Sequence, residues 1–210
     1  MKVTWLGHAC FKIESNGSSV VIDPYNNEKL PGYPELHEEA DKVLVTHEHD
    51  DHNFREAIKL TGNECALRIH EIPAFHDDQR GAVLGTNTIF VVDDGEFRIA
   101  HFGDLGHMLN EEQLDAIGKP DAAIVNVGGF VASEAAFATE LMKLVKPGWI
   151  IPCHFRGETF GVPSAGTLDE FLAMQDGNSW PVDGRSMDLV KSGRMQTVVF
   201  RTFLEPQEKN

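Results

Sequence analysis

The chain has 210 residues, of which 41% are hydrophobic, and a formal net charge of −15 at pH 7. This length and apolar content predict one domain over residues 1–210 with a sizeable buried core. No run of eighteen apolar residues is present, so we expect no membrane-spanning helix. An acidic chain without a Lys/Arg-rich stretch repels phosphate backbones, which disfavours nucleic acid as a partner.

The cysteines and the first residues bear on the cellular compartment. Cys10, Cys65 and Cys153 are odd in number and widely spaced, which argues against a disulfide framework and fits a reducing compartment. The first residues lack a basic stretch followed by a long apolar one, so we expect no signal peptide. We therefore expect a cytoplasmic protein whose partner is a small-molecule substrate, with a homo-oligomer left open.

The first part of the chain consists mainly of predicted strands. Residues 1–24 predict two strands joined by a turn at residues 15–19, and residues 25–40 predict a loop with short turns. The β-branched run KVLVTH, residues 42–47, predicts a buried strand. FREAIKLTG, residues 54–62, has apolar residues at helical spacing and predicts a helix.

The rest of the chain alternates between predicted strands and helices. Residues 66–72 predict a strand, and residues 87–104 predict a hairpin that turns at Asp94-Gly95. Helices are expected over residues 111–118, 132–148 and 167–175, and strands over residues 121–129, 149–155 and 197–203. In the last helix, Thr167 with Glu170 three positions later predicts a capping box. This order favours a layered α/β protein with the strands in the middle and the helices outside.

The heptapeptide THEHDDH, residues 46–52, places three histidines and two aspartates in one short loop. Imidazole and carboxylate groups are the usual ligands of zinc, iron and manganese. His47 and His49 can point the same way, because side chains alternate along an extended segment. Asp51 and His52 then lie in the following turn and can aim at a second point. The loop can therefore supply ligands to two metal positions.

Further polar residues directly follow predicted strands, as His47 does. These residues are Asp23, His76, Asp104 and His154. Residues at strand ends converge at one rim of a sheet, where α/β proteins build their sites. The sequence therefore predicts one metal site to which distant parts of the chain contribute.

These residues carry a resemblance to the metallo-β-lactamase superfamily. The hallmark H-x-H-x-D-H of that superfamily stands here as residues 47–52, HEHDDH. Its other elements follow in order over nearly the whole chain and match Asp23, His76, Gly103-Asp104 and His154. One departure is that Asp77-Asp78 follows His76, where larger relatives have Thr-Pro-Gly.

A finer resemblance is to a small branch of that superfamily. The segments Leu6-Gly7-His8-Ala9, Ile22-Asp23-Pro24 and Gly103-Asp104-Leu105-Gly106-His107 carry it. The chain is similar there to Zn-dependent hydrolases and to proteins like ascorbate-6-phosphate lactonase.

The resemblance implies a four-layer αβ/βα sandwich with two divalent metal ions at one edge. Zinc is the first expectation, with manganese and iron as alternatives because His and Asp ligands suit all three. The first metal position would be held by His47, His49 and His76. The second would be held by Asp51, His52 and His154, and Asp104 would bridge both.

The implied activity is that of a metal-dependent hydrolase using a metal-bridging hydroxide on a small-molecule ester, lactone or phosphoester. Asp51 and Asp104 are its expected catalytic residues, and Asp51 could also orient or deprotonate the attacking water. A non-catalytic metal-binding or sensor protein is the alternative, and a di-iron redox protein is disfavoured because the chain has no room for a flavin domain. Ser164 lacks a nucleophile-elbow pattern, which excludes a serine hydrolase.

The remaining candidates are expected to have different roles. We expect Asp23 to orient a histidine ligand, and His107 to support the site or contact the substrate. For His8 that role and a structural role remain equal alternatives. His101 is expected to be structural and Cys153 a core residue, with His37 and His70 on the surface. Arg156 could meet an anionic substrate, whereas Lys146 is expected to be a solvated surface charge.

Overall fold

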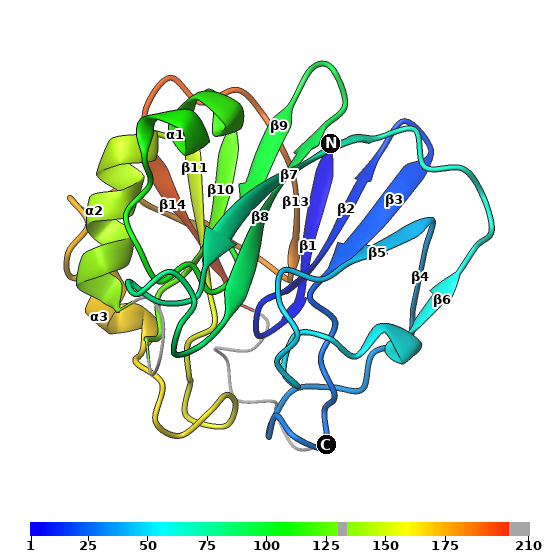
Figure 1. The fold of residues 1–210 in the computed structure, drawn as a ribbon, viewed down its shortest axis with the longest axis horizontal. Helices are drawn as coiled ribbons and strands as arrows, with labels where there is room; N and C mark the ends of the chain where they lie inside the picture. The colour runs from blue at the N-terminus through cyan, green and yellow to red at the C-terminus, as the bar shows by residue number, and fades with distance from the viewer. Residues whose placement is uncertain (130–133, 202–210) are drawn as a thin grey trace.

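The computed structural model of the chain describes residues 1–129 and 134–201, which form two β-sheets packed face to face (Figure 1). The smaller sheet has the strand order β13 (Ser186–Asp188), β1 (Lys2–Gly7), β2 (Cys10–Ser15), β3 (Ser18–Ile22), β5 (Lys42–Leu44). The larger sheet has the order β12 (Ser179–Val182), β14 (Gln196–Phe200), β11 (Trp149–Cys153), β10 (Ala122–Asn126), β9 (Arg98–His101), β8 (Thr86–Asp93), β7 (Arg68–Phe75).

Helices cover the side of the seven-stranded sheet that faces away from the smaller sheet (Figure 1). The α-helices of the described residues are α1 (Glu111–Ile117), α2 (Ala135–Val145) and α3 (Leu168–Leu172). Helix α2 buries Ala138, Leu141, Met142 and Val145, which lie on one face at helical spacing. Beside the five-stranded sheet lie the 3-10 helix η1 (Arg55–Ala57) and the strand pair β4 (Glu38–Ala40) and β6 (Ile58–Leu60).

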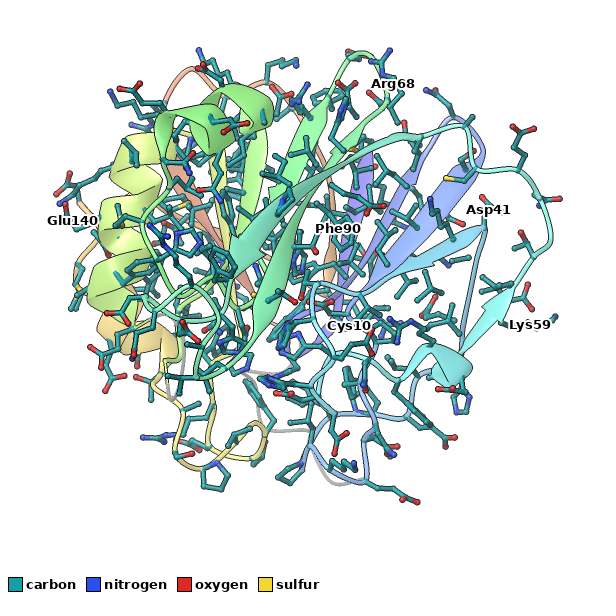
Figure 2. All side chains as sticks on the ribbon, viewed as in Figure 1. Cys10, Asp41, Lys59, Arg68, Phe90 and Glu140 are labelled. Carbon is teal, nitrogen blue, oxygen red and sulfur yellow. The ribbon has the colours of Figure 1, made fainter. Side chains whose placement is uncertain are left out.

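The core lies between the two sheets and is rich in aromatic rings. Trp5 on β1 is 1% exposed, and its ring lies 5.4 Å from that of Phe155 and 6.3 Å from that of Phe200 on β14. Figure 2 places Cys10 and Phe90 in the interior, and both are buried. Burial of such rings removes large apolar areas from water, which is the dominant favourable contribution to folding.

Strand direction places many strand ends at the same edge of the molecule. In the larger sheet β9, β10 and β11 are parallel, and β7 runs the same way because β8 is antiparallel to both β7 and β9. In the smaller sheet β3 and β5 are parallel, and β1 runs with them because β2 is antiparallel to both β1 and β3. The carboxyl ends of these strands can therefore gather side chains from distant parts of the sequence.

The layered α/β arrangement predicted from the sequence is confirmed. The hairpin at Asp94-Gly95 joins β8 to β9, and α1 and α3 lie where helices were expected. The capping box of α3 forms, since Thr167 Oγ1 accepts from Glu170 N and Glu170 Oε2 accepts from Thr167 N. No helix of the described part is long and apolar enough to cross a membrane.

The helix predicted over residues 54–62 is wrong. Only Arg55–Ala57 form a 3-10 turn, and Ile58–Leu60 form β6, which pairs in parallel with β4. Leu60 is 60% exposed, so the apolar spacing that suggested a helix does not produce a buried face. Backbone pairing with β4 outweighs the local pattern here.

Other element boundaries also differ from the prediction. Residues 1–24 form three strands rather than two, because Gly7 (φ 129°) and His8 (φ 50°) turn the chain between β1 and β2. The strand predicted over residues 42–47 ends at Leu44. The short strands β4, β12 and β13 were not predicted. Parts of the predicted helix 132–148 and strand 197–203 lie outside the described residues.

Candidate metal centre

Histidines and aspartates from five segments of the chain meet at the shared strand edge. The donor atoms of His47, His49 and His76 lie within 4.8 Å of one another. A second group with the same spacing is formed by His8, Asp51, His52 and His154, and a third by His47, His52 and Asp104. The structure thus brings together the three histidines expected for the first position and the three residues expected for the second.

Asp104 lies between these groups. Its Oδ2 atom is 3.3 Å from Nε2 of His76, 3.5 Å from Nε2 of both His52 and His154, and 3.9 Å from Nε2 of His47. One carboxylate oxygen therefore faces four imidazoles that come from both predicted metal positions.

Two asparagines fix the orientation of Asp104. Asn87 Oδ1 accepts from the Asp104 backbone N–H at 3.1 Å, and Asn126 Nδ2 donates to Asp104 Oδ1 at 2.8 Å. With Oδ1 occupied in this way, Oδ2 is the oxygen that faces the imidazoles. Gly103 makes the close approach feasible, because a Cβ there would lie 2.5 Å from Asn87 Oδ1 and 2.6 Å from Thr46.

The buried carboxylate of Asp23 determines which nitrogen of two histidines carries a proton. Asp23 Oδ2 accepts from His52 Nδ1 at 3.0 Å and from Thr46 Oγ1 at 2.7 Å. Because the Thr46 hydroxyl donates its one hydrogen to Asp23, it accepts a hydrogen bond from His47 Nδ1 at 3.0 Å. Both imidazoles therefore direct the lone pair of Nε2 toward the cluster, as a metal ligand requires.

The hydrogen bonding of the cluster tests whether metal ions would fit. Nε2 of His47 and Nε2 of His52 are buried and have no hydrogen-bond partner among the described residues. A buried polar atom without a partner costs free energy, so such atoms are rare unless another group satisfies them. A divalent cation binds nitrogen lone pairs that converge beside a carboxylate. The residues of the cluster therefore fit a bound metal ion.

Electrostatics of the cluster also favour a cation. Without a metal ion, burial lowers the pKa of His52, but the carboxylates of Asp104 and Asp23 outweigh it and raise that pKa to about 10, so a proton on Nε2 takes the place that a cation would fill. Burial and the neighbouring His52 lower the pKa of His47 to about 3. Burial opposes ionisation of Asp104, yet His154 and His52 hold its pKa well below the usual range. The carboxylates are therefore ionised and require positive charge beside them.

Asp77, where the sequence departs from larger relatives, organises the loop after His76. Its carboxylate accepts four backbone N–H groups, those of Gln79, Gly81, Val83 and Leu84, at 2.7–2.9 Å. These bonds hold the pKa of Asp77 near 2 despite the opposing effect of desolvation. The loop is thus closed by a side chain that directly follows a predicted ligand.

Several candidates lie outside the cluster. His107 is tied to backbone, since its Nε2 accepts from Phe75 N and its Nδ1 bonds to Met108 O, so it supports the end of β7. His101 is buried and bonds to Ala9 O, as expected of a structural residue. Lys146 ends α2 just before β11 begins, at the opposite edge from the cluster. His37 and His70 are exposed, and Cys153 is buried.

Thr46, Asn87 and Asn126 belong to the centre and were not predicted from the sequence. Asn126 ends β10, so the pattern of polar residues at strand ends could have identified it. Thr46 directly precedes His47, which is a weaker indication. Asn87 lies at the start of β8 and carries no comparable pattern, because its contact with Asp104 arises only from the pairing of β8 with β9.

Comparisons with known proteins identify the family of the chain. The family described as the beta-lactamase superfamily domain matches residues 2–154. A UPF0173 metal-dependent hydrolase of Korarchaeum cryptofilum is 30% identical over 199 residues, covering 77% of this chain and 85% of that protein. Its counterpart in Archaeoglobus fulgidus is 29% identical over 195 residues, with 74% and 83% covered.

A solved structure extends the likeness to the whole fold. A Thermotoga maritima protein described as a Zn-dependent hydrolase of the metallo-β-lactamase superfamily superposes with a TM-score of 0.74 at 27% identity. The match covers 95% of this chain and 97% of that one. The finer likeness to ascorbate-6-phosphate lactonase stays a prediction. The chain therefore belongs to the metallo-β-lactamase superfamily and, within it, to a family of metal-dependent hydrolases.

Proposed function

We propose that the chain is a binuclear hydrolase that holds two divalent ions, zinc before manganese or iron, and cleaves a small-molecule ester, lactone or phosphoester. The observation that carries this proposal is the position of Asp104 Oδ2, which lies within 3.3–3.9 Å of four imidazole nitrogens. A carboxylate between two ligand groups offsets the repulsion of two neighbouring cations.

The ligands divide between the two positions as the spacing of their donor atoms suggests. His47, His49 and His76 would hold one ion, and Asp51, His52 and His154 the other. Asp104 would contribute to both. Divalent ions held in this way lower the pKa of bound water to about 7 and polarise the bond that is cleaved.

The two aspartates of the cluster suit different tasks. The Asp51 side chain is 29% exposed, whereas that of Asp104 is 6% exposed. Asp51 is therefore the carboxylate that an entering substrate and its attacking water can reach. The neighbouring imidazoles of His154 and His8 outweigh burial and keep the pKa of Asp51 far below its usual range, so it is ionised and able to accept a hydrogen bond from water.

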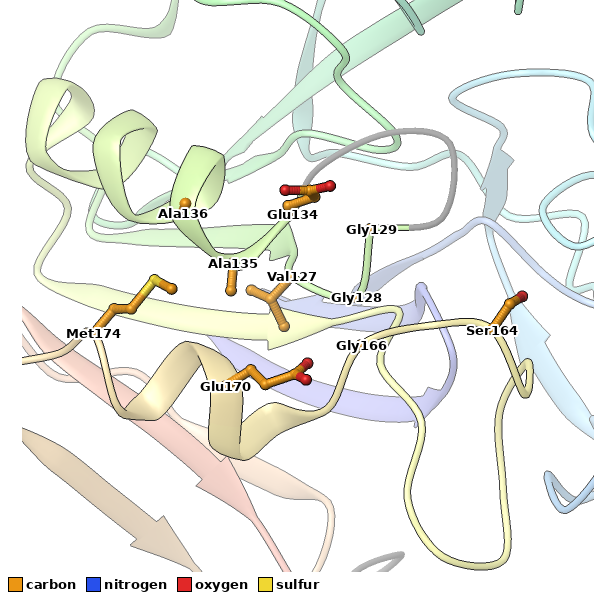
Figure 3. A pocket seen from close by; sticks show the side chains of 10 residues that line it. All are labelled: Val127, Gly128, Gly129, Glu134, Ala135, Ala136, Ser164, Gly166, Glu170 and Met174. Carbon is orange, nitrogen blue, oxygen red and sulfur yellow. The ribbon is translucent and has the colours of Figure 1, made fainter.

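A cavity lined by residues of α2 and α3 and by Gly128 is a candidate for the non-reacting part of the substrate (Figure 3). It has a volume of about 580 Å³, and its wall includes Gly128, where an added Cβ would lie 1.9 Å from the carbonyl oxygen of His154. The carboxylates of Glu134 and Glu170 lie on either side of it. With a net charge of −15 as well, a neutral or cationic group fits there better than an anion.

The test is a substrate screen on protein of measured metal content. Model esters, lactones and phosphodiesters are offered to the metal-loaded chain, to the chain stripped by a chelator, and to the stripped chain after zinc or manganese is restored. We expect turnover of at least one class, lost on stripping and regained on restoration. Turnover that survives complete metal removal would contradict the mechanism, and bound metal without turnover would favour the sensor alternative.

A further inference from the structure

His8 stands in the cluster on a backbone conformation that side-chain-bearing residues seldom adopt. Its φ is 50°, and it follows Gly7 at the point where the pairing of β1 with β2 shifts register. Six described residues other than glycine have positive φ, and three of them, His8, Asp23 and His154, lie in or beside the cluster. Such strain persists where the surrounding structure holds it, and it concentrates at functional sites.

The backbone around His8 is held from two sides. Its carbonyl accepts from Trp5 Nε1 at 2.9 Å and from the His154 backbone N–H at 3.2 Å. The second bond ties the turn after β1 to the turn after β11, which belongs to the other sheet. The position of the His8 ring relative to the cluster is therefore fixed by both sheets.

Among the described residues, the ring of His8 makes one hydrogen bond, and its partner is Asp51. His8 Nε2 lies 3.1 Å from Asp51 Oδ2, and the imidazole is 2% exposed. An ionised carboxylate only accepts, so Nε2 carries the proton and donates it. The ring lies 3.9 Å from that of His154, and Nδ1 is buried without a partner in the described part of the chain. As a donor, Nε2 of His8 is not available as a metal ligand.

We infer that His8 is a positioning residue that holds the Asp51 carboxylate against the second metal position. Two other imidazoles lie close to Asp51, since Nε2 of His52 and Nε2 of His154 are each 3.6 Å from Asp51 Oδ2. Both of these histidines are themselves proposed metal ligands. His8 is thus the neighbour free to fix Asp51 without binding the ion. The inference rests on the proposed function, and it explains why a strained, buried histidine occupies this turn.

The experiment compares His8→Ala and His8→Gln with the parent chain and with His70→Ala, an exposed histidine outside the cluster. Binding of zinc at each position is measured by competition with a chromophoric chelator, and folding is checked by thermal unfolding. Loss of a residue that orients a metal ligand typically costs 10–100-fold in metal affinity. We expect a loss of about that size at one position in His8→Ala, with the other position unchanged.

His8→Gln separates positioning from ligation, because its amide N–H can donate to Asp51 while an amide nitrogen does not bind zinc. Recovery of most of the lost affinity supports the inference. Equal loss in both variants would make His8 a ligand and overturn it. Parent-like binding in a folded His8→Ala chain would also overturn it and leave the proposed function standing. Failure of the parent itself to bind metal would reject the proposed function first.

Discussion

The Asp23 carboxylate acts on two imidazoles, directly on His52 and through Thr46 on His47. A histidine can bind a metal through Nε2 only when its proton resides on Nδ1. One buried acid therefore sets the tautomer of a proposed ligand in each metal position. Asp23 is therefore expected to influence metal affinity although it is not itself a proposed ligand.

Replacement of Asp23 by Asn tests this role. The Asn amide would present a donor where His52 now donates, so His52 would have to accept at Nδ1 and carry its proton on Nε2. We expect zinc affinity to fall by about 10–100-fold, measured by competition with a chelator. Asp41→Asn is the control, since Asp41 also bonds a hydroxyl and a backbone N–H but lies outside the cluster. Equal losses in the two variants would contradict the tautomer argument.

Asp104→Ala is expected to be more severe. The substitution removes the one oxygen that faces four imidazoles, and the cations would then repel each other without an anion between them. We expect at least one metal ion to be lost or weakened and turnover to fall by orders of magnitude. His37→Ala, with its side chain 77% exposed, should leave both unchanged. Parent-like metal content in Asp104→Ala would remove Asp104 from the site.

The loop after β7 depends on one carboxylate that accepts four backbone amides. Asp77→Ala leaves those amides of residues 79–84 without their acceptor, and we expect their hydrogen exchange to accelerate. Asp78→Ala is the matched control, because the neighbouring Asp78 is exposed. Unchanged exchange in Asp77→Ala would show that the loop is held by other contacts. A weaker zinc affinity in the same variant would show that the loop also supports His76.

Elements differ in how far the sequence predicts them. The polar residues at strand ends were predictable because an apolar run followed by a His or Asp is a local pattern in the sequence. This pattern occurs after β5, β7, β9 and β11. The interval 54–62 was not predictable, because its pairing with β4 depends on a partner that the local spacing does not reveal. Asn87 was missed for the same reason, whereas the loop of residues 47–52 carries its ligands within one short stretch.

The cluster joins the two sheets of the molecule. His47, Asp51 and His52 follow β5 of the five-stranded sheet, whereas His76, Asp104 and His154 follow strands of the seven-stranded sheet. Bound ions would therefore link the two layers in addition to the apolar core between them. Metal that binds the folded chain alone also stabilises it by mass action.

Chelation should consequently lower the thermal stability of the whole molecule. Zinc present at 1,000 times its dissociation constant would contribute about 4 kcal/mol per position. At about 2–4 °C per kcal/mol for a domain of this size, we expect the unfolding midpoint to fall by roughly 15–30 °C on stripping of both positions. Calorimetry with and without chelator measures this. Asp104→Ala should show a smaller change, because it is expected to hold less metal. An identical midpoint before and after stripping would contradict a metal link between the sheets.

We expect the crowded loop of residues 47–52 and the distant strand ends to hold two metal ions together. Elemental analysis of chain purified without chelators, and again after supplementation with zinc or manganese, tests it most directly. We predict about two divalent ions per chain, falling to one or fewer in Asp104→Ala. A parent chain that retains well below one ion after supplementation would contradict the binuclear centre.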